Sequence, residues 1–103
     1  MKVTNLYHVN QYVIQGDNTI TFQSYDSECA RIDKNGDLIL GIDWDYSNTT
    51  LRHLYMFLSD YLYKMNSENR QYFKYDFETC TNKRLYIQKL IDKKLIKYNE
   101  NMR

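Results

Sequence analysis

The apolar positions of the chain change their period near its middle. Leu38, Leu40, Ile42 and Trp44 recur at every second position, which predicts a β-strand with one apolar face. Farther on, the apolar positions take the i, i+3, i+4, i+7 spacing of an amphipathic helix. They are Leu51, Leu54, Tyr55, Leu58, Tyr61, Leu62 and Met65. We therefore expect a strand, a polar corner and a helix long enough to cover a sheet.

Ser47 is the expected N-cap of that helix, which we place at Ser47–Met65. A serine at this position accepts a hydrogen bond from a backbone amide two or three residues farther on. Tyr46 and Leu51 then stand at the two positions of a hydrophobic staple, in which an apolar side chain before the cap packs against one in the first turn. We expect Trp44 and the corner to be structural first.

Shorter β-prone segments, separated by turn signals, precede this stretch. Residues 16–18 and 24–27 carry the small and polar side chains typical of turns. Between them, Ile20 and Phe22 lie on the same side of a predicted strand. The segments with strand character are residues 5–9, 12–15, 19–23 and 28–32.

Two registers are open for the connection at Asp33–Asp37. A two-residue Asn-Gly hairpin would pair Ile32 with Ile39. A type I turn that ends at Gly36 instead pairs Ile32 with Leu38. Only this second register puts the apolar residues of both strands on one face, and a slip of one residue would invert all of them. We expect the second register.

The segment after the long helix allows more than one assignment. Residues 71–77 are rich in aromatic side chains and form either another strand or an aromatic loop packed under the sheet. Thr81 is the expected N-cap of a second helix at Asn82–Lys93. Leu95–Tyr98 is the expected final strand.

These elements predict a single α+β domain that spans residues 1–103. An antiparallel sheet of about four to five strands has one long helix packed across a face, with a second C-terminal helix and a short final strand. A chain of this length supports one compact core. The residues expected there are Ile20, Phe22, Ala30, Ile32, Leu38, Leu40, Ile42, Trp44, Leu51, Leu54, Leu58, Leu62, Leu90 and Ile91.

Composition and charge argue against a membrane protein. No run approaches the roughly 18 apolar residues of a transmembrane helix, and the first residues lack the apolar core of a signal peptide. We expect a cytoplasmic protein in which Cys29 and Cys80 are free thiols.

Residues 1–60 carry four basic and eight acidic side chains, a net charge of −4, whereas residues 61–103 carry ten basic and five acidic side chains, a net charge of +5.

Paired carboxylates are one candidate for chemistry. Asp43 and Asp45 share one face of the predicted strand, with Cβ atoms about 7 Å apart. Such a pair could act as acid and base or hold a divalent cation. No third ligand accompanies them, so we expect no metal site.

A hydrolase triad is the other candidate. Ser47, His53 and Asp60 lack the nucleophile elbow and the oxyanion-hole glycines of such enzymes. His8 and His53 do not stand at metal-ligand spacing from a second His, Cys or acid. We expect no enzymatic activity and no cofactor.

A basic face is predicted along the second helix and the strand after it. With the aromatic residues at 72–75, its side chains are of the kinds that bind single-stranded nucleic acid. The other interpretation is a solvated helix face. The residues are Lys83, Arg84, Lys89, Lys93, Lys94 and Lys97.

The first helix is apolar on more than one side, which is typical of a central helix or of an interface. Large apolar and tyrosyl side chains are enriched at interface cores. The candidate protein-binding residues are Tyr55, Met56, Phe57, Tyr61 and Tyr63. The same surface could equally form a homodimer.

Two short motifs resemble a small uncharacterised protein family of phages and plasmids from low-GC Gram-positive bacteria. Its pattern is Phe-x-Ser-Tyr, then a strand, then Trp-x-Tyr-Ser-x-Thr-Thr opening a helix with Phe-Leu near its middle. Here the two motifs are Phe22–Tyr25 and Trp44–Thr50, the Phe-Leu pair is Phe57–Leu58, and the resemblance covers about residues 11–62. The family is of unknown function, so it implies no catalytic residues.

The resemblance implies a mobile-element origin. Small phage proteins often act by stoichiometric binding to a host enzyme, as anti-CRISPR proteins do, and this step is an analogy. The leading expectation is therefore a non-enzymatic phage accessory protein that binds a host protein, such as a defence nuclease, and inhibits it. The alternative is a small nucleic-acid-binding protein.

Overall fold

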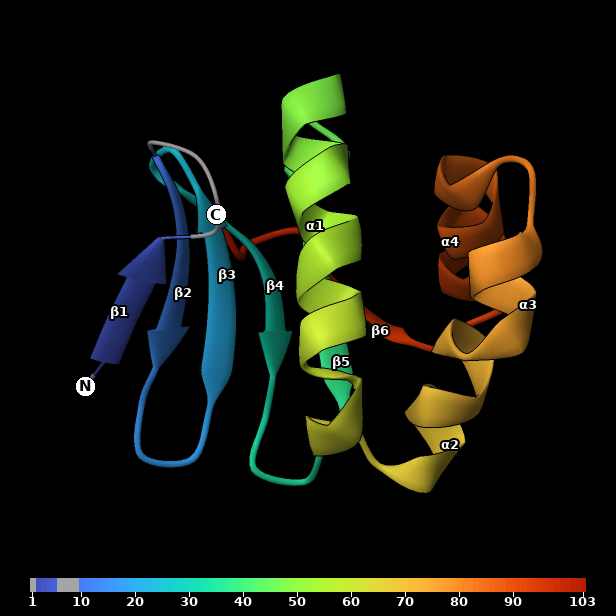
Figure 1. Ribbon diagram of the computed structural model, residues 1–103, viewed down its shortest axis with the longest axis horizontal. Helices are drawn as coiled ribbons and strands as arrows, with labels where there is room; N and C mark the ends of the chain where they lie inside the picture. The colour runs from blue at the N-terminus through green and yellow to red at the C-terminus, as the bar shows by residue number, and fades with distance from the viewer. Residues whose placement is uncertain (1, 6–9) are drawn as a thin grey trace.

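Six strands form one sheet, and a helix lies across one of its faces in this computed structural model (Figure 1). The structure describes residues 2–5 and 10–103. Neighbouring strands from β1 to β5 pair antiparallel, and β6 joins β5 in parallel. In spatial order the strands are β1 (Lys2–Asn5), β2 (Gln11–Gln15), β3 (Ile20–Ser24), β4 (Ser27–Ile32), β5 (Leu38–Gly41) and β6 (Lys97–Asn99). The predicted α+β class is confirmed, whereas residues 6–9 of the predicted first strand lie outside the described residues.

The helices follow the five-strand meander. They are α1 (Asn48–Asp60), the 3-10 turn η1 (Leu62–Lys64), α2 (Ser67–Arg70), the 3-10 turn η2 (Gln71–Phe73), α3 (Tyr75–Thr79) and α4 (Lys83–Asp92). Helix α1 lies in front of the sheet, whereas α2, α3 and α4 gather beyond β5 and β6 (Figure 1). Within the described part of the chain, no helix is long and apolar enough to span a membrane.

The β4–β5 connection takes the second of the two registers. The Gly36 amide donates to the Asp33 carbonyl over 2.9 Å, as a type I turn requires. Ile32 pairs with Leu38, and both side chains are buried. The prediction from burial is confirmed.

Helix α1 begins where the sequence predicts and ends earlier. Ser47 Oγ accepts a hydrogen bond from the Thr50 amide over 3.1 Å, so the predicted N-cap is confirmed. The α-helix ends at Asp60 because the Tyr61 backbone leaves helical geometry, with φ −112° and ψ 18°. Met65, the predicted end of the helix, is still buried.

The core lies between the sheet and α1. Phe22 stacks on Phe57 with ring centroids 5.8 Å apart. Most predicted core residues are buried, but Leu62 and Ile91 are only partly so, and Ile42 is 39% exposed. The buried apolar residues outside the predicted core list are Val13, Cys29, Phe57, Met65, Phe73, Phe77, Ile87, Ile96 and Met102.

The core prediction for Ile42 is wrong because its strand ends sooner than expected. Strand β5 stops at Gly41, and the Trp44 amide donates to the Gly41 carbonyl in a turn. The Ile42 amide donates instead to the Met102 carbonyl over 3.1 Å. This contact with the C-terminal tail ends the period-two alternation, so Ile42 faces solvent while Trp44 remains buried.

The segment after α1 is helical, whereas the sequence predicted either a strand or an aromatic loop there. Within residues 71–77, Gln71–Phe73 form η2 and the rest after Lys74 belongs to α3. The N-cap of α4 is Asn82, whose side chain accepts from the Leu85 amide over 3.0 Å. The prediction of Thr81 is therefore wrong by one residue, between two residue types that both cap helices. Strand β6 begins two residues later than predicted.

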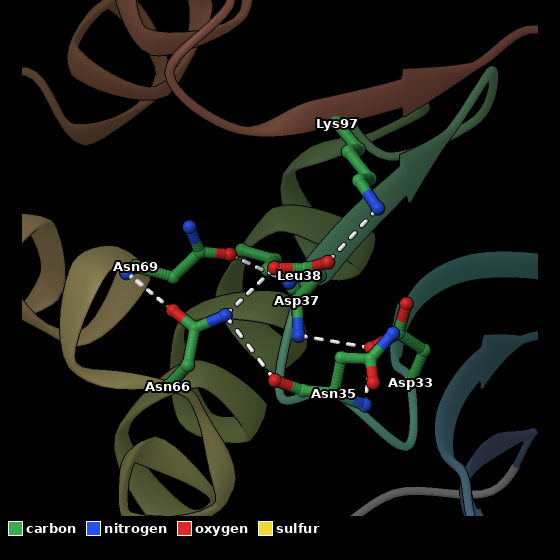
Figure 2. A network of polar contacts seen from close by, with 7 residues as sticks. All are labelled: Asp33, Asn35, Asp37, Leu38, Asn66, Asn69 and Lys97. Atoms are coloured by element: carbon green, nitrogen blue, oxygen red, sulfur yellow. Dashed lines mark hydrogen bonds and ion pairs between the residues drawn. The ribbon is translucent and has the colours of Figure 1, made fainter.

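A network of polar side chains joins the β4–β5 turn to α2 and β6 (Figure 2). Asn66 Nδ2 donates to Asp37 Oδ1 over 2.6 Å, and Asn69 Oδ1 accepts from the Leu38 amide over 2.7 Å. Lys97 Nζ pairs with the other carboxylate oxygen of Asp37 over 2.9 Å. One aspartate therefore holds together three elements that are far apart in sequence.

Candidate functional site

A cavity of about 550 Å³ opens between the tip of the β3–β4 hairpin and the first turn of α1. Its size is in the range of small-ligand pockets, about 300–1,000 Å³. Both sequence motifs contribute to it, so we call it the motif pocket. Its lining residues are Ser24, Tyr25, Asp26, Ser27, Cys29, Asp43, Tyr46, Ser47, Thr49 and Thr50.

The hairpin tip holds Tyr25 in an unusual backbone conformation. Ser24 pairs with Ser27, so Tyr25 and Asp26 form a two-residue loop. The favoured two-residue turns need a positive φ at the first loop position, which Gly or Asn usually takes. Tyr25 occupies it with φ 55°, which costs a residue of its size about 1–3 kcal/mol. This strain presents a tyrosyl side chain, 46% exposed, to the pocket.

A β-bulge brings Cys29 into the wall of the pocket. Phe22 pairs with Ala30, but the next residue, Gln23, pairs with Glu28. Cys29 is therefore the extra residue on β4. Bulges bend a strand and re-aim a side chain, and here both Cys29 and Ala30 are buried.

The thiol in the pocket is not an activated nucleophile. Burial raises the pKa of Cys29 to about 12, and the nearby Asp43 carboxylate acts in the same direction. The attacking species in cysteine chemistry is the thiolate. Because the pKa lies far above neutrality, Cys29 stays protonated, and its Sγ lies 3.4 Å from the Asp43 carbonyl oxygen as a donor.

Hydroxyl groups join the hairpin to the helix along the floor of the pocket. Ser24 Oγ and Thr50 Oγ1 lie 3.0 Å apart in a buried hydrogen bond. Ser47 Oγ donates to Thr50 Oγ1 over 3.1 Å and also caps the helix. Together these bonds fix the two motifs against each other.

The two aspartates of the corner face different partners. Asp43 Oδ2 accepts from Ser27 Oγ over 2.8 Å and lines the pocket. Asp45 Oδ2 accepts from Arg84 Nη2 and Nε over 2.7 and 3.1 Å. The prediction that Asp43 and Asp45 share a strand face is wrong, since β5 ends at Gly41.

Ser47, His53 and Asp60, the triad considered and rejected from the sequence, lie apart in the structure. His53 is buried with Nδ1 2.8 Å from the Thr49 carbonyl oxygen, and Ser47 is the helix cap. Asp60 is exposed at the C-terminal end of α1, roughly 18 Å along the helix axis from the first residue of the helix. Residues 2–5 and 10–103 contain no group of three or more His, Cys, Asp or Glu that could hold a metal ion. His8 lies outside the described residues.

The aromatic ring of Tyr46 is turned to solvent. Its side chain is 74% exposed and lines the motif pocket, while Leu51 is buried. The predicted hydrophobic staple between these residues is therefore wrong, because an exposed ring buries little area against the first turn. Tyr46 is a functional candidate that the staple interpretation concealed.

The predicted protein-binding residues of α1 and η1 do not share one surface. Phe57 is fully buried in the core. Tyr55 packs on an α3 ring at 5.7 Å, and Tyr61 on the Phe57 ring at 5.3 Å. Met56 is half-buried, and only Tyr63 is mostly exposed, at 66%.

The predicted basic residues divide into two groups. Three of them make contacts within the protein: Arg84 with Asp45, Lys97 with Asp37, and Lys83 over an α3 ring at 5.4 Å. The other three are exposed around the C-terminal end of α4. They are Lys89, Lys93 and Lys94.

The fold and the pocket define a small α+β protein whose two motifs line one cavity. The chain belongs to a family of unknown function, DUF8033, whose sequence profile matches residues 1–76. The match covers β1 to β5, α1 and the whole motif pocket, and it ends within α3. No curated protein and no solved structure matches the chain.

Proposed function

We propose that the protein acts by binding another protein, without catalysis, and that the motif pocket is the contact site. The observation that carries this proposal is one cavity in which two exposed tyrosines, several hydroxyls and two carboxylates gather. Such groups hydrogen-bond and stack on a partner, and tyrosine is enriched at interface hot spots.

The chemistry of the pocket supports binding over catalysis. Its thiol stays protonated, and Ser24 and Ser47 hold structural hydrogen bonds. Ser27 donates to Asp43, but among residues 2–5 and 10–103 no histidine or lysine lines the pocket to activate a hydroxyl. Serine nucleophiles are activated by a neighbouring base such as histidine or lysine, and the only base that the described residues place beside Ser27 is the weakly basic Asp43 carboxylate.

A host protein is the partner we propose. The resemblance to small phage and plasmid proteins suggests an inhibitor of a host defence nuclease, and this step remains an analogy. The contact site proposed here replaces the side of α1 predicted from sequence, because Phe57 is in the core.

Capture from a lysate of a low-GC Gram-positive bacterium, with matched baits, tests the proposal. The baits are the wild type, Tyr46→Ala and Tyr63→Ala, which remove exposed rings at opposite ends of the α1–η1 segment. We expect one host protein to bind the wild type and Tyr63→Ala stoichiometrically and to lose at least about tenfold in affinity for Tyr46→Ala, a hot-spot effect. Melting temperatures close to that of the wild type would show that both variants are folded.

Three outcomes would contradict this proposal. Loss of the partner only with Tyr63→Ala would move the contact site to the side of α1. A size measurement that shows a dimer through Tyr63, with no captured protein, would favour self-association. Turnover of a nucleotide or peptide by the pure protein would make it an enzyme.

Nucleic-acid binding remains the alternative proposal, supported by the three exposed lysines near the end of α4. It predicts a mobility shift at low salt that disappears when Lys89, Lys93 and Lys94 are replaced with Glu, because each phosphate contact releases counterions. No shift at low salt would retire it.

A further inference from the structure

The charge of the motif pocket has one sign. Asp26 and Asp43 are acidic, and no lysine or arginine is among the ten lining residues. Neither acid takes part in an ion pair among residues 2–5 and 10–103. A cavity lined by one sign of charge concentrates ligands of the opposite sign, so this pocket favours a cation.

The two tyrosines at the pocket favour a cation of a particular shape. Tyr25 and Tyr46 both line the cavity, and both rings are exposed. Aromatic faces attract cations within about 6 Å of the ring centroid. An arginine side chain binds more tightly than a lysine at such a site. Its planar guanidinium can stack on a ring and donate two parallel hydrogen bonds to a carboxylate.

The protein already holds one guanidinium in this way, at the two residues between Asp43 and Tyr46 in the sequence. Arg84 Cζ lies 5.9 Å from the centre of the Trp44 ring, and its nitrogens donate to Asp45 Oδ2. A ring and a carboxylate from adjacent residues thus suffice to bind an arginine within the protein. The motif pocket offers the same pair of groups without an internal arginine.

A second hollow suggests that the cation belongs to a peptide chain. This hollow of about 430 Å³ is lined by Val3, Tyr12 and Ile14 together with the polar Asn10 and Gln23, and it shares Tyr25 and Asp26 with the motif pocket. The hairpin tip therefore lies between two hollows, and the second adds the aliphatic side chains of Val3 and Ile14. A segment that places an arginine in the first can rest an apolar side chain in the second.

We propose that the motif pocket binds an arginine side chain of the partner protein, with an apolar residue of the same segment in the second hollow. This inference rests on the proposed function and names the chemistry of its partner. The guanidinium bonds Asp26 and Asp43 and stacks on the rings of Tyr25 and Tyr46.

A blocked peptide with one arginine flanked by leucine and alanine residues tests this assignment by NMR titration of the full chain. Citrulline in place of arginine is the matched control, because it keeps the shape of the side chain and removes the charge. We expect shifts at the amides of residues 24–27 and 46–50. We also expect the affinity for the citrulline peptide to be lower by at least about fivefold. This factor corresponds to the interaction energy of one pair of opposite charges in water.

Two variants separate binding from folding. Tyr25→Gly removes the ring and relieves the strain of the positive φ. It should therefore keep or raise the melting temperature while lowering the affinity for the arginine peptide. Asp26→Asn removes only a charge from an exposed loop residue. It should lower the affinity for the arginine peptide about fivefold and leave the affinity for the citrulline peptide unchanged.

The results distinguish this inference from the proposed function. Equal affinity for both peptides, shifts confined to other residues, or no shifts with either peptide would overturn the arginine assignment. A host protein still captured through Tyr46 would leave the proposed function standing in each of those cases. Failure of that capture would overturn the proposed function itself.

Discussion

At the scale of single residues, Gln11 combines full burial with unpaired polar atoms. It lies on β2 opposite Ser24 of β3, and among the residues that the structure describes neither its amide nitrogen nor its oxygen has a hydrogen-bond partner. An unsatisfied buried polar group costs about 1–3 kcal/mol, whereas an apolar group of the same shape avoids that cost.

Gln11→Met is therefore expected to raise the free energy of unfolding by about 1 kcal/mol or more. Urea denaturation followed by circular dichroism measures the change, with Gln11→Glu, which buries a charge, as the destabilised control. A lower stability for the Met variant would show that Gln11 makes a hydrogen bond in solution.

Trp44 is the residue whose removal should harm the fold most at the corner. Its ring is buried and lies beside the Arg84 guanidinium. Trp44→Ala should cost about 3–5 kcal/mol and leave the protein insoluble or largely unfolded, whereas Ser47→Ala should cost about 1 kcal/mol. Thermal melts of both variants give the comparison, and wild-type stability for Trp44→Ala would refute the structural role.

At the scale of elements, the β4–β5 turn leaves no room for a side chain at Gly36. Its φ is 80°, and a Cβ atom there would lie 2.5 Å from the Asn66 amide nitrogen. Gly36→Ala is expected to destabilise the protein by about 1–3 kcal/mol through backbone strain and this clash. Gly16→Ala is the matched control in a denaturation series, because a Cβ atom there would lie 3.1 Å from the Thr19 hydroxyl and 3.8 Å from the Thr19 carbonyl oxygen.

The Asp37–Lys97 pair that ends this turn should make part of the stability depend on pH. The hydrogen bond from Lys97 lowers the pKa of Asp37 from its ordinary value of 3.8, against the opposing effect of burial. Because the folded pKa lies below the unfolded one, the pair stabilises the fold above about pH 4, and this contribution is lost as pH falls through the folded pKa.

Asp37→Asn should therefore melt below the wild type at neutral pH and approach it in acid. Thermal melts between about pH 7 and about pH 2 follow the difference. A gap between the two melting temperatures that stays constant over this range would mean that the carboxylate charge contributes nothing.

Local signals in the sequence predicted the elements whose determinants are local. The Ser47 cap and the register of Ile32 with Leu38 depend on neighbours within a few residues, and both are confirmed. The end of β5 depends on the Met102 carbonyl, which no local pattern reveals. For the same reason the sequence predicted the turn at Ser24–Ser27 and the Ser47 cap but did not show that the two motifs enclose one cavity.

Aromatic residues were the least predictable part of the candidate site. Phe57 and Tyr46 look alike as large rings near a helix, yet one is fully buried and the other is 74% exposed. The spacing of residues along a helix gives the angular position of each side chain around the helix axis. It does not show whether a sheet, another helix or solvent lies there.

At the scale of the whole molecule, β6 protects the edge of the sheet. It pairs with Ile39, Leu40 and Gly41, and the tail beyond it buries Met102. A chain truncated before Lys97 should lose stability and self-associate, because an unpaired strand edge is a template for other chains.

Size-exclusion chromatography with light scattering and a thermal melt test the truncation. The full-length variant Lys97→Ala is the control, since it loses the ion pair with Asp37 and keeps the strand. A truncated chain that stays monomeric and melts with the wild type would show that β6 is dispensable.

The parallel pairing of β5 with β6 also sets an order of events in time. The bond between Asp37 and Lys97 closes a loop over 60 residues, whereas Ile32 and Leu38 meet across the short turn between them. Loop-closure entropy makes the long closure about 2 kcal/mol more costly than the short one. The five-strand meander can thus assemble from neighbouring contacts, while the last strand docks late and is the first to detach. During each such excursion, the edge of β5 is briefly exposed in an otherwise native molecule.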